Sequence, residues 1–132
     1  MPDYKEIVYC TDFSENADHA FGDAKYMAGI AGAKLFVLHV TPGAAGGSAT
    51  SKEKESGVEN LRTHYACEGD VDYVLRTGNE ATEILQFADE HAGAPIVLGA
   101  RGVGALFGIF GGSIADKVTR HAKSPVLVVP NS

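Results

Sequence analysis

The feature that most constrains this chain is a regular alternation between short apolar runs and stretches that carry a helical stripe. Five mostly apolar runs recur along the sequence, at 7–10, 34–40, 71–76, 96–98 and 126–129. Between them, apolar residues recur with the spacing of one face of a helix. Strands that alternate with helices form a parallel sheet with helices on both faces. The pattern therefore predicts an α/β fold of three layers, α/β/α, with five strands and four helices.

Capping residues give the expected helix boundaries. Ser14 and Asn79 are good N-caps for the first and third helices, and Gly29 and Gly32 mark the end of the first. The second helix is expected over 52–66, after a Gly/Ala/Ser-rich segment with the composition of a flexible linker. The run Ser113-Ile114-Ala115-Asp116 matches a capping box that opens the fourth helix. The third strand is the most polar, so it is expected at an edge of the sheet.

Length and charge exclude several classes of function. A chain of 132 residues predicts a single domain, 1–132. The formal net charge is −6 and no Lys/Arg cluster stands out, which argues against nucleic-acid binding and a polybasic membrane anchor. No apolar run approaches the roughly 20 residues of a membrane span, and no secretory signal pattern opens the chain. Cys10 and Cys67 have no metal-ligand spacing. We expect a cytoplasmic protein with no membrane partner.

The ends of two predicted strands point to a ligand site. Asp12 follows the first strand and Gly99 follows the fourth. In parallel α/β sheets, ligands bind beyond the carboxyl ends of the strands, where the strand order reverses. Placing the first and fourth strands side by side predicts the order 3-2-1-4-5, with the reversal between them.

A glycine-dense stretch, 98–113, connects the fourth strand to the last helix, a usual place for a phosphate. It is not a P-loop, because the chain has no Gly-Lys-Ser or Gly-Lys-Thr. A dinucleotide fingerprint starting at Gly102 fails at Phe107. Nucleophile-elbow and zinc-protease motifs are also missing from the sequence. The spacing that does fit is Gly99-2x-Gly102-9x-Gly112-Ser113.

That spacing resembles the nucleotide-binding signature of the universal stress protein family. Further segments resemble the family in the same order along nearly the whole chain: Thr11-Asp12-Phe13-Ser14, Leu38-His39-Val40, Arg76-Thr77-Gly78-Asn79 and the C-terminal run from Ser113 to Val129. The resemblance implies a Rossmann-like fold of the adenine-nucleotide alpha-hydrolase kind. It also implies a homodimer formed through the last strand, Val126–Val129, whose uncharged edge invites pairing with a second chain.

The resemblance further implies a site for ATP, ADP or AMP. Asp12 and Val40 fall at the adenine and ribose end, while Gly99, Gly102, Gly112 and Ser113 fall at the phosphates, bridged by Mg²⁺ or Mn²⁺ rather than by metal-binding side chains. Arg101 can supply positive charge. The full expected set is Thr11, Asp12, Val40, Leu98, Gly99, Arg101, Gly102, Gly112, Ser113 and Ile114.

Four functional interpretations follow. The leading one is an adenine-nucleotide-binding stress or signalling module with little turnover, because no catalytic base or nucleophile is evident. The second is an enzyme, either a slow ATPase or a protein that phosphorylates itself on Ser113 or a nearby serine. The third is a nucleotide-free module that acts through its dimer surface, and a flavin carrier is the fourth. His39 and Cys10 are expected to be core residues, and the apolar loop residues Leu106, Phe107, Ile109 and Phe110 to contact a core or a second subunit.

Overall fold

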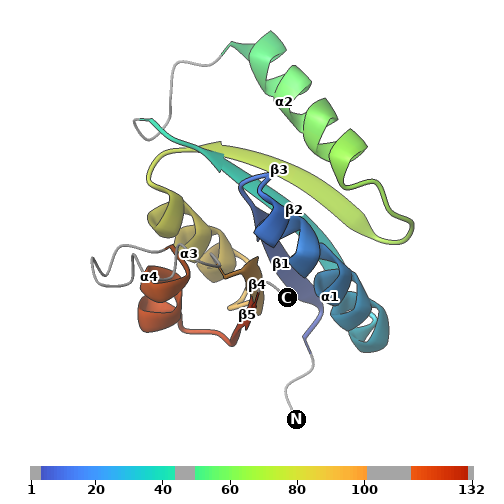
Figure 1. The fold of residues 1–132 in the computed structure, drawn as a ribbon, viewed down its shortest axis with the longest axis vertical. Helices are drawn as coiled ribbons and strands as arrows, with labels where there is room; N and C mark the ends of the chain where they lie inside the picture. Colours follow the sequence, from blue (N-terminus) through green and yellow to red (C-terminus); the bar gives the residue numbers. More distant parts are fainter. Residues whose placement is uncertain (1–3, 44–49, 101–113, 131–132) are drawn as a thin grey trace.

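The computed structural model describes residues 4–43, 50–100 and 114–130, in which five strands alternate with four helices (Figure 1). The strands are β1 (Glu6–Thr11), β2 (Lys34–Thr41), β3 (Val71–Thr77), β4 (Ile96–Gly99) and β5 (Val126–Val129). The helices are α1 (Glu15–Ala31), α2 (Ser51–His64), α3 (Glu80–Glu90) and α4 (Ile114–His121). The predicted α/β alternation is confirmed. Within these ranges, no helix is both long and apolar enough to cross a bilayer.

All neighbouring strands pair in parallel, in the order β3-β2-β1-β4-β5. In the register, Val8 of β1 pairs with Phe36 on one side and with Ile96 on the other. The order reverses between β1 and β4, as predicted, and β3 and β5 form the two edges. The carboxyl ends of β1 and β4 therefore lie side by side.

The sheet is covered on both faces, which explains why its central strands are apolar throughout. Alternate residues of each strand point to opposite faces. Ile7 and Tyr9 belong to the core cluster under α1 and α2, whereas Val8 and Cys10 belong to the cluster under α3 and α4. In Figure 1, α1 and α2 are separated from α3 and α4 by the sheet.

Local capping sets most helix ends where the sequence predicts them. Ser14 accepts a hydrogen bond from Ala17 N, and Asn79 accepts one from Thr82 N. Helix α1 runs past Gly29 and ends at Ala31, because Gly32 adopts the left-handed conformation (φ 64°) that closes it. Helix α2 spans Ser51–His64 rather than 52–66. The capping box at Ser113 lies outside the described residues.

The backbone of Gly99 lies directly against the first turn of α1. A Cβ atom at this position would collide with the carbonyl oxygen of Asn16. Glycine is therefore required here by helix packing, since nothing larger lets β4 approach the helix this closely. This contact ties α1 to the end of β4, across the reversal in strand order.

Two tyrosines lie in the core between the sheet and the helices α1 and α2. Tyr9 and Tyr65 are 0% and 1% exposed, and their rings pack edge to face with centroids 5.4 Å apart. The pKa of Tyr65 is raised to about 12, mainly by burial and secondly by the hydrogen bond to the carboxylate of Asp18. Burial likewise raises the pKa of Tyr9. Both phenols are therefore neutral in the folded protein at neutral pH.

The first prediction concerns Gly99. We expect Gly99→Ala to lower the free energy of unfolding by about 1–3 kcal/mol, because backbone atoms must shift to admit the methyl group. The control is Gly22→Ala, in an exposed part of α1 where an added Cβ meets nothing within 4 Å. The control should raise stability by about 0.5–1 kcal/mol, because alanine favours helix. Urea denaturation measures both, and equal behaviour of the two variants would contradict the packing argument.

The second prediction concerns alkaline pH. Below pH 10, Tyr65 is neutral in both the folded and the unfolded chain and does not change stability with pH. Between pH 10.0 and about 12, the unfolded chain releases this proton while the folded protein keeps it, so stability falls as pH rises. Denaturation at a series of pH values should show a shallower decline for Tyr65→Phe than for the parent protein. Parallel curves would show that Tyr65 titrates normally.

Candidate functional site

A cleft lies where the strand order reverses, at the carboxyl ends of β1 and β4. Residues from both strands and from the first turns of α1, α3 and α4 line it. The lining residues are Cys10, Asp12, Ser14, Asn16, Ala17, Glu80, Ile84, Leu98, Gly99, Ile114 and Ala115. The cleft thus occupies the position at which open α/β sheets bind their ligands.

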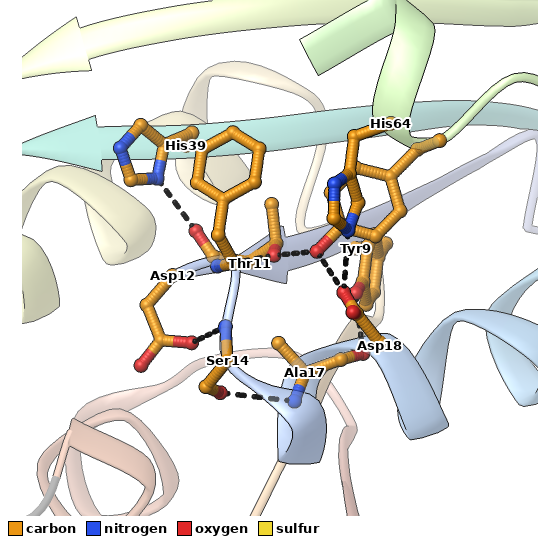
Figure 2. Close-up of polar contacts among 10 residues, drawn as sticks. Tyr9, Thr11, Asp12, Ser14, Ala17, Asp18, His39 and His64 are labelled. Atoms are coloured by element: carbon orange, nitrogen blue, oxygen red, sulfur yellow. Dashed lines mark hydrogen bonds and ion pairs between the residues drawn. The ribbon is translucent and has the colours of Figure 1, made fainter. Parts of the chain in front are cut away.

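The turn between β1 and α1 carries Asp12 into this cleft. The Oδ1 atom of Asp12 accepts a hydrogen bond from Ser14 N at 2.9 Å, and Ser14 Oγ in turn accepts from Ala17 N at 3.2 Å (Figure 2). Phe13, which lies between Asp12 and Ser14, has a φ of 66°. This left-handed conformation is unusual for a residue with a large side chain. The Asp12 side chain is exposed, and these local hydrogen bonds fix the conformation of the turn that carries it.

Thr11 and His39 hold this turn from the sheet. The carbonyl oxygen of Thr11 is hydrogen-bonded to His39 Nδ1 at 2.8 Å, as Figure 2 shows. The Thr11 hydroxyl is hydrogen-bonded to Tyr65 and accepts from Phe13 N at 2.9 Å. His39 is therefore a half-buried residue with a polar partner, in agreement with the structural role expected for it.

The structure separates the predicted site residues into three groups. Asp12, Leu98, Gly99 and Ile114 meet in the cleft. Thr11 and Val40 do not line it: the Thr11 hydroxyl bonds toward α2, and Val40 is buried in the core under α3 and α4. The remaining four, Arg101, Gly102, Gly112 and Ser113, lie outside the described residues.

Several lining residues have no counterpart in the sequence prediction, above all Glu80. This residue begins α3, after the turn at Gly78 and the N-cap Asn79. It reaches the cleft because α3 starts at the carboxyl edge of the sheet, as helices of parallel α/β folds do. The capped helix start was readable from the sequence, but its proximity to Asp12 was not.

The thiol of Cys10 also lines the cleft. Burial raises its pKa, and the carboxylate of Glu80 adds to the effect. A protonated thiol is a poor nucleophile, so Cys10 serves as an apolar wall, as the sequence predicts. In the described ranges, no group of three or more His, Cys, Asp or Glu side chains is arranged to hold a metal ion.

The described part of the cleft combines helix N-termini, apolar side chains and the carboxylates of Asp12 and Glu80. The N-termini of α1, α3 and α4 all border it, and each presents the positive end of a helix dipole. Ile84, Leu98 and Ile114 provide apolar walls. The Asp12 carboxylate can accept hydrogen bonds from a hydroxyl or an amine.

Comparison with known proteins identifies the family. Residues 3–130 match the model of the universal stress protein family. A universal stress protein of Thermus aquaticus is 33% identical over 135 residues, covering 96% of this chain and 98% of the relative. A second, from Methanocaldococcus jannaschii, is 28% identical over 153 residues, covering 96% and 94%.

Solved structures of this family share the fold. A universal stress protein in complex with cAMP superimposes with a TM-score of 0.79 at 24% identity, covering 99% of this chain and all of the other. The universal stress protein of Archaeoglobus fulgidus in complex with dAMP superimposes with a TM-score of 0.62 at 26% identity, covering 97% and 99%. Sequence, topology and these matches agree: the chain belongs to the universal stress protein family.

Proposed function

We propose that this protein binds an adenine nucleotide, ATP or else ADP or AMP, in the cleft between β1 and β4, and acts as a stress-response or signalling module with little turnover. The observation that carries the proposal is the cleft itself. It places the Asp12 carboxylate and three helix N-termini around one crevice at the reversal in strand order. The dAMP complex of the Archaeoglobus fulgidus relative supports an adenine nucleotide as the ligand.

Each part of the cleft has a role in this proposal. Asp12 accepts hydrogen bonds from the ribose hydroxyls or the adenine amine, and the helix N-termini with Gly99 face the phosphates. A bound Mg²⁺ or Mn²⁺ would neutralise phosphate charge. Such an ion prefers oxygen ligands, which the phosphate groups and water would supply.

The cysteines fit a cytoplasmic location, which is part of the same proposal. Cys10 is buried and Cys67 half-buried, and neither forms a disulfide. Free thiols are typical of a reducing compartment.

We also propose that two copies pair through β5, at the edge of the sheet. Leu127 is a large apolar residue that is 39% exposed on this strand, and Val126–Val129 carries no charge. Ile96 N donates to Pro125 O and Ala100 N donates to Val129 O, so alternate residues of β5 face β4. The N–H and C=O groups of Val126 and Val128 therefore point to the outer edge, where a second strand can pair with them.

The third prediction tests nucleotide binding. Titration calorimetry with ATP, ADP and AMP in the presence of Mg²⁺ should detect binding to the parent protein. Asp12→Ala should weaken it by roughly 10-fold to 100-fold, the usual effect of losing a charged hydrogen-bond partner. Asp12→Asn keeps an oxygen that can accept from Ser14 N. This variant therefore separates the effect of losing the charge from the effect of losing the hydrogen bond that holds the turn.

The control for this experiment is Asp70→Asn, which makes the same charge change at an exposed carboxylate beside Lys34. It should leave affinity unchanged. Absence of binding of all three nucleotides at millimolar concentration would reject the proposal and favour a nucleotide-free module. Release of ADP from ATP, or a phosphorylated protein in mass spectra, would instead indicate an enzyme.

The fourth prediction tests the dimer. Val128→Pro removes an outward N–H group but no hydrogen bond to β4, so the fold should persist while pairing is lost. Val128→Thr keeps the N–H group and serves as the control. Sedimentation equilibrium at micromolar concentration should give a dimer for the parent and for Val128→Thr, and a monomer for Val128→Pro. A monomeric parent protein would contradict the proposed pairing through β5.

A further inference from the structure

A continuous series of hydrogen bonds connects the end of α2 to the turn that carries Asp12. Tyr65, which follows α2, donates its phenolic proton to Asp18 Oδ1 at 2.6 Å. A phenol has one proton and a carboxylate can only accept, so the Thr11 hydroxyl must be the donor in its bond to Tyr65. The Thr11 oxygen then accepts from Phe13 N at 2.9 Å. Every donor and acceptor in the series is thereby assigned.

Phe13 is the residue in this series whose backbone conformation must be enforced by its neighbours. Its φ of 66° is costly for a phenylalanine, and such a conformation persists only where its surroundings enforce it. The bond from its N–H to Thr11 is one constraint. Packing of its ring against His39 and Tyr65, with centroids 4.7 and 5.9 Å away, is the other. Tyr65 contributes to both.

The two bonds that fix Asp18 differ in their shielding from water. His64 Nε2 lies 3.0 Å from Asp18 Oδ1, but the side chains of His64 and Asp18 are 42% and 43% exposed. Tyr65 is 1% exposed. Since hydrogen bonds shielded from water are electrostatically stronger, the Tyr65 hydroxyl is the better anchor between Asp18 and the turn.

We propose that Tyr65 is a positioning residue for the nucleotide site: its hydroxyl orients Thr11, which holds Phe13 left-handed and so fixes Asp12 over the cleft beside Gly99. This role rests on the proposed nucleotide binding. It makes the end of α2, a helix that does not line the cleft, a determinant of affinity. A movement of α2 that withdraws Tyr65 would therefore weaken binding without any contact between the helix and the ligand.

The fifth prediction compares two variants that each lose one phenolic hydroxyl from the same side of the sheet, where Tyr73 packs against the core cluster that contains Tyr65. Tyr65→Phe keeps the ring packing but breaks the series of hydrogen bonds. Tyr73→Phe, the control, removes a 2.8 Å bond to the carbonyl oxygen of Tyr65 and leaves the series intact. Tyr65→Phe should weaken ATP binding by about threefold to tenfold, the range expected for one hydrogen bond, while Tyr73→Phe should not.

A second measurement is independent of nucleotide. In ligand-free protein, amide hydrogen exchange followed by NMR should speed up at Phe13 in Tyr65→Phe relative to the sheet amides, and not in Tyr73→Phe. Unchanged Phe13 exchange in Tyr65→Phe overturns the inference, as does equal loss of affinity in both variants. If the parent protein binds no nucleotide, the proposed function fails, and the exchange comparison still decides whether Tyr65 holds the turn.

Discussion

The close approach of two backbones, at Gly99 and Asn16, is the constraint on which the rest of this structure depends. It lets the first turn of α1 lie on the end of β4 although α1 follows β1 in the chain. Helix α1 therefore spans the reversal in strand order, and the turn that precedes it meets the end of β4. Without this contact, Asp12 and Gly99 would end neighbouring strands but would not border one cleft.

Most of the fold could be predicted because its determinants are local. A strand buried on both faces is largely apolar along its length, and the runs at 7–10, 34–40 and 96–98 proved to be central strands of this kind. The apolar run at 126–129 also proved to be a strand, at the edge of the sheet. Helix starts followed the caps Ser14 and Asn79. The order 3-2-1-4-5 was predicted by a different argument, from the positions of Asp12 and Gly99. Boundaries were less accurate. Helix α2 ends at His64 rather than at residue 66, because the backbone of the buried Tyr65 is no longer helical.

The candidate site was less readable, because its parts come together only in the folded chain. Thr11 and Val40 belong to the predicted strand ends, yet their side chains point into the two cores rather than into the cleft. Glu80 lines the cleft through the start of a distant helix. The left-handed Phe13 has no sequence signal, since asparagine, aspartate or glycine is usual in that conformation. Its ring packs against His39 and Tyr65, which lie far along the chain.

Gly99 also shows how a signature residue can have two reasons to be present. Its glycine is required by the carbonyl of Asn16, whether or not a phosphate ever binds nearby. A match to the glycine spacing is therefore compatible with both the nucleotide-binding and the nucleotide-free interpretation. Asp12 is different, because its exposed carboxylate fills no space in the core. The hydrogen bond that it accepts from Ser14 N needs only one oxygen atom, which an asparagine side chain would also provide. The turn that presents this carboxylate contains the left-handed Phe13 and is held by two buried side chains, Thr11 and Tyr65. Backbone strain of this kind is common at ligand sites. The balance between the two interpretations thus rests on Asp12 and the network beneath it rather than on the glycines.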